Sequence, residues 1–268
     1  MQKETGFAEV NGTRLYYEVA GEGHPLVLIH GLVSDCRTWE DQFEPFAERF
    51  RVVCYEWRGM GRSAVPTKES YRHADDLRAL LEYWGMTRTH VLGFSAGASI
   101  ALDFALAWPE MTSALILVGG GAPPGYAWGP EWDEWFGLYR STAVESGPEA
   151  ANRLFLEIPL LAPAMKIPEV ARRTTEMVMD NSGWNWLNDD PAQDAAVLAP
   201  AQFEAPVLII VGEREHRDNL RATDVLSQQL PHAHRVVVPN VGHMVNMEAP
   251  EQFNELVLSF LVGVAPSN

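Results

Sequence analysis

The sequence is poor in cysteine and basic residues, and it lacks long apolar runs. Its 268 residues include two cysteines, Cys36 and Cys54, too few for a disulfide framework or a four-thiolate metal site. No window approaches the roughly 18 uncharged apolar residues of a membrane span, and residues 1–6 carry no apolar stretch of the signal-peptide kind. These absences predict a cytoplasmic protein without a membrane segment.

Basic residues are fewer than acidic residues, so the chain carries a net negative charge. Lys and Arg number 20 and Asp and Glu number 36, which gives a formal net charge of −16. A field of this sign repels phosphate backbones and anionic lipid surfaces, so neither nucleic acid nor membrane is expected as a partner. Hydrophobic residues make up 47% and charged residues 21% of the chain, as in an ordinary globular protein. A small-molecule substrate is therefore the expected partner, and the oligomeric state stays open.

Strand and helix patterns alternate along most of the chain. An Asn11-Gly12 pair divides an alternating stretch at 7–19, which predicts a hairpin. Further strand-like runs lie at 25–31, 51–55, 90–93, 114–118, 206–211 and 235–238, and helical patterns at 39–49, 71–84, 98–107, 219–230 and 251–261. This alternation predicts an α/β fold with a doubly wound, mostly parallel sheet covered on both faces.

The alternation is interrupted between residues 119 and 204. A glycine- and proline-rich exit at 119–125 is followed by helical patterns, with helix stops expected at five prolines: Pro148, Pro159, Pro163, Pro168 and Pro191. No strand-like run returns before 206. We therefore expect a core formed by 1–121 and 206–268, with a helical cap inserted at 122–205.

The sharpest local signal is the sequence Gly-Phe-Ser-Ala-Gly at 93–97, between an expected strand and an expected helix. This context is typical of a nucleophile elbow, where a tight turn strains the serine and the flanking glycines allow close backbone approach. The hydroxyl of Ser95 then stands at a helix N-terminus, whose free N–H groups favour developing negative charge. Ser95 is thus the candidate nucleophile.

A serine needs a base, and the base needs an acid to orient it. His243 follows the last expected strand, so the sheet brings it to the edge that also carries Ser95. In the chain order serine, acid, histidine, the acid should follow the 206–211 strand. Three carboxylates compete there: Glu213, Glu215 and Asp218.

An oxyanion formed at Ser95 needs hydrogen-bond donors. The backbone N–H of Ala96 directly follows the serine, and the N–H of Leu32 lies in a glycine-containing turn after the first long strand. One such donor is worth about 3 kcal/mol in the transition state. We expect Leu32 and Ala96 to form the oxyanion hole, and His30 to be structural.

Together these motifs resemble the α/β-hydrolase fold superfamily, within it the small serine hydrolases with a helical cap, such as 3-oxoadipate enol-lactonase-like esterases. The resemblance rests on His30-Gly31 and on the motifs at 57–63, 93–97, 212–215 and 242–243. It implies a Ser-acid-His triad without a cofactor, and it favours Glu215 over Asp218 as the acid. The family usually has Asp at the positions of Glu215 and Glu56, so the acid is a departure, and the Glu56 change is interpreted as structural.

Aromatic residues indicate where a substrate binds. Five of the nine tryptophans fall in the cap segment, Trp128 and Trp132 among them. A cleft between cap and core is a usual ligand site, and some of these rings also serve to hold the cap on the core. We expect a substrate pocket lined by Trp128, Trp132, Trp39, Phe94 and Met244.

The sequence thus predicts hydrolysis of a carboxylic ester or lactone, of an apolar or aromatic substrate, through an acyl-enzyme on Ser95. Open alternatives are carbon–carbon bond hydrolysis of a vinylogous diketone, perhydrolysis, and a ligand receptor on this fold. No dinucleotide fingerprint follows the first long strand. His216, His232 and His234 lack metal-ligand spacing, so neither cofactor nor metal is expected.

Overall fold

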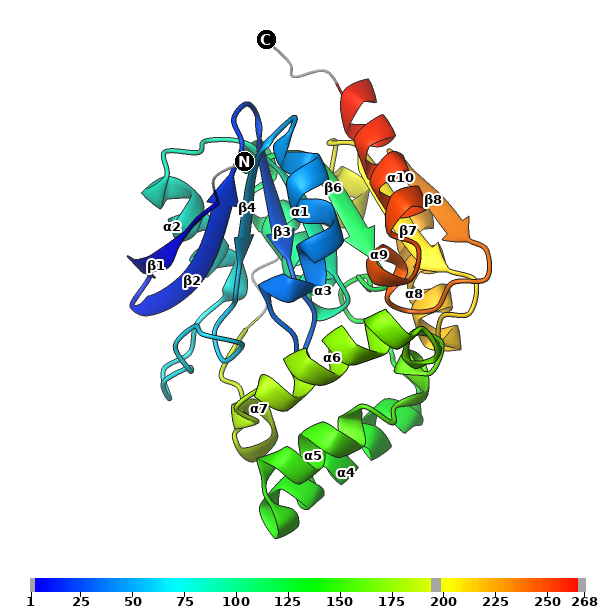
Figure 1. Cartoon of the computed structure of the whole chain (residues 1–268). Coiled ribbons are helices and arrows are strands. Elements are labelled where there is room, and N and C mark those ends of the chain that lie inside the picture. Colours follow the sequence, from blue (N-terminus) through cyan, green and yellow to red (C-terminus); the bar gives the residue numbers. More distant parts are fainter. Residues whose placement is uncertain (1–2, 194–198, 265–268) are drawn as a thin grey trace.

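The computed structural model describes residues 3–193 and 199–264. Its centre is an eight-stranded sheet in the order β1-β2-β4-β3-β5-β6-β7-β8 (Figure 1). Strands β3 to β8 run parallel, and β2 is antiparallel to both of its neighbours. The bounds are β1 Glu4–Val10, β2 Thr13–Ala20, β3 Pro25–Ile29, β4 Arg51–Tyr55, β5 Thr89–Phe94, β6 Thr112–Val118, β7 Val207–Gly212 and β8 Ala233–Val238. The predicted α/β class with a mostly parallel sheet is confirmed.

The first two strands form the predicted hairpin. Asn11 and Gly12 at its tip have φ angles of 45° and 69°, the left-handed values that a two-residue hairpin turn requires and that Asn and Gly tolerate best. β1 pairs with β2 from Glu4↔Val19 to Val10↔Thr13 without a register shift. The hairpin thereby closes one end of the sheet.

Helices cover both faces of the sheet. Neighbouring residues of each central strand point to opposite faces, so Leu26 and Leu28 join one apolar cluster and Val27 and Ile29 the other. The first cluster includes side chains of α1 (Glu40–Ala47), α9 (Val245–Glu248) and α10 (Pro250–Gly263), and the second those of α2 (His73–Tyr83), α3 (Ala96–Ala107) and α8 (Arg217–Gln229). In the described part of the chain, no helix is long and apolar enough to cross a membrane.

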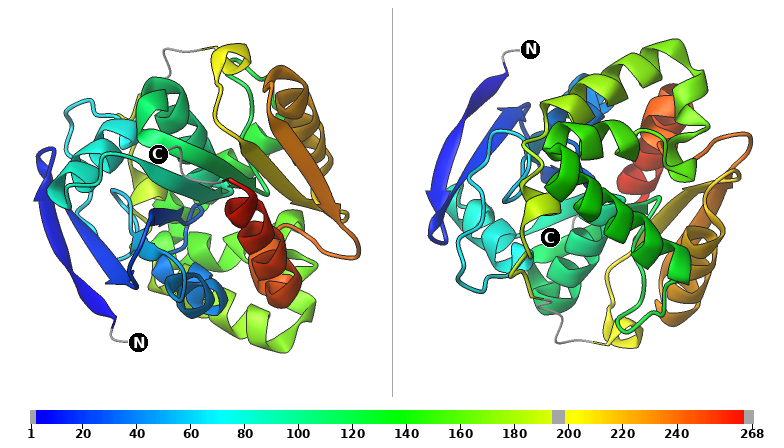
Figure 2. Two further views of the ribbon diagram at one scale, coloured as in Figure 1. Left: turned by 90° about the horizontal axis from the view of Figure 1, so that it is seen from above. Right: turned by 90° about the horizontal axis from the view of Figure 1, so that it is seen from below.

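The chain between β6 and β7 forms a separate helical layer across one end of the sheet, the green helices of Figures 1 and 2. Its helices are α4 Pro130–Ser146, α5 Pro148–Phe155, α6 Pro168–Asp180 and α7 Trp184–Leu187, with short 3₁₀ turns η3 Pro159–Leu161 and η4 Ala164–Lys166. A further 3₁₀ turn, η5 Pro200–Gln202, contacts α8 and lies outside this layer. We call this layer the cap. Of the predicted ranges, residues 1–2, 194–198 and 265–268 lie outside the described residues.

The cap prolines mark helix ends and helix starts together. α4 ends at Ser146, shortly before Pro148, and Pro148, Pro159 and Pro168 are also the first residues of the elements that follow. A proline fits there because the first helical N–H has no intrahelical acceptor and the fixed φ suits a helix. Pro163 precedes η4, and Pro191 lies between α7 and η5. Helices and turns thus end before most of these prolines, as expected, and three of the prolines also begin the next element.

Because strands β3 to β8 are parallel, four loops lie at the same edge of the sheet, next to the cap. The loops after β3, β5, β7 and β8 all leave the carboxyl ends of parallel strands. Residues far apart in sequence, from Leu32 to His243, consequently meet there. In open α/β sheets this edge is where ligand sites form.

Candidate active site

Ser95 stands on a strained turn between β5 and α3. Its φ and ψ are 54° and −119°, a combination that costs a non-glycine residue about 1–3 kcal/mol. The flanking glycines make the turn possible, because a Cβ on Gly93 would lie 2.1 Å from the Gly97 carbonyl oxygen, and one on Gly97 2.3 Å from that of Ile29. The strand and helix therefore hold the Ser95 hydroxyl out toward the cap.

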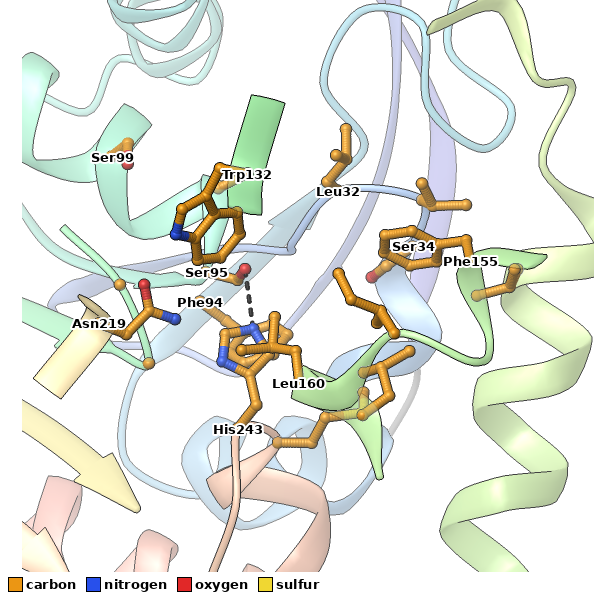
Figure 3. A pocket seen from close by; sticks show the side chains of 18 of the residues that line it. Leu32, Ser34, Phe94, Ser95, Ser99, Trp132, Phe155, Leu160, Asn219 and His243 are labelled. Atoms are coloured by element: carbon orange, nitrogen blue, oxygen red, sulfur yellow. Dashed lines mark hydrogen bonds between the residues drawn. The ribbon is translucent and has the colours of Figure 1, made fainter. Parts of the chain in front are cut away.

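Ser95, His243 and Glu215 form a continuous hydrogen-bonded chain. His243 Nδ1 lies 2.7 Å from Glu215 Oε2, and its Nε2 lies 2.9 Å from Ser95 Oγ, the contact dashed in Figure 3. A carboxylate only accepts hydrogen bonds, so Nδ1 carries the proton and Nε2 is free to accept from the serine hydroxyl. This is the geometry in which a histidine can take up the serine proton.

The Glu215 carboxylate is held from both sides. Its side chain is fully buried, and its Oε1 accepts hydrogen bonds from the His216 backbone N–H at 2.7 Å and from Asn219 Nδ2 at 3.2 Å. A buried carboxylate calls for such partners, since an unpaired buried charge is costly. Asn219 was missed by the sequence analysis, although its place four residues after Glu215, at the start of a helix, puts it within reach.

The two competing carboxylates of this loop lie elsewhere. Glu213 is exposed and accepts from the backbone N–H of Asn240 at 2.8 Å. Asp218 Oδ2 accepts from the backbone N–H of Gly129 and from Trp132 Nε1, at 2.8 and 3.0 Å. Of the three candidates in the sequence, the structure brings Glu215 to the histidine.

Glu248 supports the loop that carries His243 and was also missed. Its carboxylate accepts from the backbone N–H groups of Gly242 at 2.8 Å and Met244 at 3.0 Å, on either side of the histidine. Burial raises the pKa of Glu248, against the lowering effect of these hydrogen bonds. A carboxylate five residues after a loop histidine is too common a pattern to single out in a sequence.

Leu32 and Ala96, the expected oxyanion donors, line the same cavity as Ser95. Ala96 is the first residue of α3, where an N–H has no intrahelical acceptor, and within the described ranges neither amide donates to another protein group. His30, next to this turn, is fully buried, and its Nδ1 donates to the Gly31 carbonyl at 2.8 Å. Burial lowers the pKa of His30, which agrees with a neutral structural ring.

A cavity of about 350 Å³ lies between the core and the cap, over Ser95 (Figure 3). It falls in the range of small-molecule sites. Four of the five expected pocket residues line it, namely Phe94, Trp128, Trp132 and Met244. Much of the remaining wall is apolar and comes from the cap: Phe136, Phe155, Ile158, Leu160, Leu161, Met177 and Val178.

Trp39 does not line this cavity, contrary to the expectation. Its side chain is fully buried in the core, with ring centroids 6.5 Å from Phe94 and 6.4 Å from Phe253. It lies on the short helix Cys36–Trp39 that leads into α1, on the side facing α10. Trp39 therefore supports Phe94 from behind the cavity wall.

The cap tryptophans divide into two groups. Trp128 and Trp132 line the cavity. Trp186 is buried inside the cap against Tyr139 and Phe155, and its Nε1 donates to Asn152 Oδ1 at 2.7 Å. The two roles considered for these rings, pocket wall and packing within the cap, thus both occur in different residues.

Positive side chains are absent from the described cavity wall, whose acidic member is Asp133. Four arginines of the cap pair with carboxylates elsewhere: Arg140 with Asp189, Arg153 with Glu149, Arg172 with Glu169 and Glu176, and Arg173 with Asp41. In the described ranges, no three His, Cys, Asp or Glu side chains are grouped as metal ligands would be. Cys36 and Cys54 are buried and unbridged.

Comparison with known proteins agrees with this geometry. Residues 24–250 match the model of the alpha/beta hydrolase fold family. The chain is 28% identical over 270 residues to the putative carbamate hydrolase RutD of Caulobacter sp. (strain K31), covering 94% of this chain and 97% of the relative. It is 29% identical over 270 residues to 2-hydroxy-6-oxononadienedioate/2-hydroxy-6-oxononatrienedioate hydrolase 2 of Pseudomonas putida, covering 92% and 91%.

A similar solved structure is the enol-lactonase from Burkholderia xenovorans LB400, with a TM-score of 0.83 and 25% identity. The superposition covers 96% of this chain and 100% of that one, cap included. These proteins carry names for different hydrolytic reactions, so they agree on the reaction class and differ in the bond that is cleaved. The chain belongs to the alpha/beta hydrolase fold family and is a hydrolase.

Proposed function

We propose that this protein hydrolyses carboxylic esters or lactones of small, neutral, apolar or aromatic substrates through an acyl-enzyme on Ser95. The observation that carries the proposal is the chain from Glu215 through His243 to Ser95, which ends in an apolar cavity. A serine activated by a base and facing free backbone donors is the arrangement that acyl transfer requires.

In the proposed reaction, His243 Nε2 takes the proton of Ser95 as Oγ forms a bond to the substrate carbonyl carbon. The N–H groups of Leu32 and Ala96 donate to the oxyanion. Collapse of the tetrahedral intermediate breaks the bond between the carbonyl carbon and the alkoxy oxygen of the ester. The leaving alkoxide takes the proton from His243. Water then attacks the acyl-enzyme, gives a proton to His243, and releases the acid while the proton returns to Ser95. Glu215 stabilises the imidazolium in both halves.

The cavity wall supports the neutral class of substrate. Burying a carboxylate without a positive partner costs several kcal/mol, and neither Lys nor Arg lines the described cavity. The aromatic and aliphatic side chains of the cap instead favour an apolar acyl or alcohol group. This argues against a dioate substrate of the kind named for the Pseudomonas putida relative.

The test uses Ser95→Ala with p-nitrophenyl butyrate as a neutral ester. We expect kcat/KM to fall by roughly 10³-fold or more, with an unchanged circular dichroism spectrum. Ser259→Ala, at an exposed serine of α10 that does not line the cavity, is the control. Undiminished turnover by purified Ser95→Ala would contradict the proposal, and product analysis with a vinylogous diketone separates ester from carbon–carbon hydrolysis.

A further inference from the structure

Asp218 is a carboxylate near the site that takes no part in the hydrogen-bonded chain of Glu215, His243 and Ser95. It is the second residue of α8, three residues after Glu215, and it does not line the cavity. Its Oδ2 accepts from two donors of one segment, the Gly129 backbone N–H at 2.8 Å and Trp132 Nε1 at 3.0 Å. Gly129 caps the N-terminus of α4, and Trp132 belongs to the first turn of that helix. One carboxylate oxygen therefore joins the core to the beginning of the cap.

At this contact, the carboxylate of Asp218 lies so close to the backbone of Gly129 that no room is left for a side chain there. A Cβ on Gly129 would lie 2.6 Å from Asp218 Oδ2 and 2.5 Å from Glu131 Oε2. Any side chain at position 129 would force the carboxylate away. Glu131, in the same turn of α4, accepts from Arg217 Nη2 at 2.5 Å, so a second bond joins the same two helix starts. Arg217 is largely exposed, and this outer pair contributes little stability.

The Trp132 indole is positioned by this contact and by its aromatic neighbours. Its ring centroid lies 5.2 Å from that of Trp128, 5.3 Å from Trp135 and 5.4 Å from His216, each edge to face. Such pairs contribute about 1 kcal/mol each and favour one ring orientation. The ring lines the cavity above Ser95 (Figure 3). Without the hydrogen bond, the indole N–H would lose its acceptor at a partly buried position.

We infer that Asp218 is a positioning residue that clamps the start of α4 to α8 and fixes Trp132 as a substrate-facing wall. It thereby sets substrate affinity and selectivity, while the chemical step depends on other residues. The inference rests on the proposed function for the site that Trp132 lines. The adjacent Asn219 contacts Glu215, so the first turn of α8 supports the acid through one residue and the cap through the other.

The kinetic test compares Asp218→Ala with Asp218→Asn, using p-nitrophenyl butyrate. Asp218→Ala removes the shared acceptor, and we expect KM to rise about tenfold with kcat changed less than threefold. Asp218→Asn keeps a carbonyl oxygen that can accept from both donors, so KM returns close to the wild-type value. Asp224→Ala, at an exposed carboxylate of the same helix, is the matched control.

Trp132→Phe and Gly129→Ala test the same contact by changing the cap residues that donate to Asp218. Trp132→Phe removes one donor and keeps an aromatic ring, so its KM rises less than that of Asp218→Ala. In the double variant, we expect the fold-increase in KM to be smaller than the product of the two single increases. Gly129→Ala pushes the carboxylate away and raises KM as Asp218→Ala does. An unchanged KM in Asp218→Ala, or a loss confined to kcat with a shifted pH profile, overturns the inference.

A readout independent of turnover separates this inference from the proposed function. In protein labelled with 5-fluorotryptophan, the ¹⁹F resonance of Trp132 is the one missing from Trp132→Phe. We expect it to shift or broaden in Asp218→Ala and to return in Asp218→Asn; an unmoved resonance overturns the clamp whether or not the protein is active. Fluorophosphonate labelling of Ser95 in the wild type tests the proposed function by itself.

Discussion

At the scale of single residues, the acid that we propose to orient His243 is a glutamate, one methylene longer than the aspartate usual in the family. The longer side chain bends back on its own loop, where Oε1 accepts from the next backbone N–H, that of His216, and Oε2 reaches His243. The departure in side-chain length is thus absorbed locally. The acid keeps the short contact of 2.7 Å to Nδ1 that a triad needs.

Glu215→Gln tests this role. The amide oxygen of glutamine can still meet the His216 N–H, which turns the amide N–H₂ toward Nδ1 and favours the wrong tautomer of His243. We expect kcat to fall by roughly 10³–10⁴-fold. Glu213→Gln, at an exposed carboxylate of the same loop, should stay close to the wild type in steady-state kinetics. Equal losses in both variants would show that the loop fold is responsible, with no special role for Glu215.

Ser95, His243 and Glu215 could be predicted from the sequence to different degrees. Ser95 and His243 stand directly after strands whose pattern is clear, and the sheet order then brings them together. Glu215 and Asp218 lie three residues apart in one loop, and which of them faces the histidine depends on the side-chain direction at the start of α8. Trp39 was misplaced for the same reason, since nothing local says whether a ring points to the cavity or to the core.

At the scale of elements, strands were predicted closely, and cap helices were not. β4 has the bounds that were expected, 51–55, because a continuous apolar run between polar residues has few other solutions. The cap boundaries depend on prolines, whose restricted φ suits either a helix start or the residues after a helix end. The strand pattern identifies the core, and the cap layout follows from packing over the sheet edge.

His90, a buried histidine near the start of β5, makes stability depend on pH. Burial, with His24 and Arg88 nearby, lowers the pKa of His90 to about 3, and its ring centroid lies 4.4 Å from that of His24. Between pH 6.5, the usual value, and about 3, the unfolded chain binds a proton at His90 that the folded protein does not. Stability contributed by the neutral ring is therefore lost as the pH falls through this window.

We expect the unfolding free energy of the wild type to decrease from pH 7 to pH 4.5 more steeply than that of His90→Phe. The difference in slope below pH 6 should be roughly 1 kcal/mol per pH unit. Urea titrations at several pH values measure it. His234→Gln, at an exposed position of β8, is the control and should keep the wild-type slope. Parallel pH profiles for the wild type and His90→Phe would exclude His90 as the cause.

At the scale of the whole molecule, the charge of −16 and the cavity wall act on a substrate at different ranges. The overall field repels an anion from a distance and is screened by salt, with a Debye length of about 8 Å at physiological ionic strength. The cavity, whose described wall holds Asp133 and no Lys or Arg, penalises an anion after it has entered. That second penalty is a desolvation cost, on which salt has little effect.

Paired substrates separate the two effects. We expect mono-p-nitrophenyl succinate, which carries a carboxylate, to react with a kcat/KM roughly 100-fold below that of p-nitrophenyl butyrate. Raising NaCl from 0.05 to about 0.5 M should recover only a few-fold of this difference, because screening removes the distant repulsion alone. Asp133→Asn should recover a further part for the anionic ester and leave the neutral one almost unchanged. Full recovery by salt would place the selectivity in the overall charge, and equal rates for the two esters would contradict a cavity built for neutral substrates.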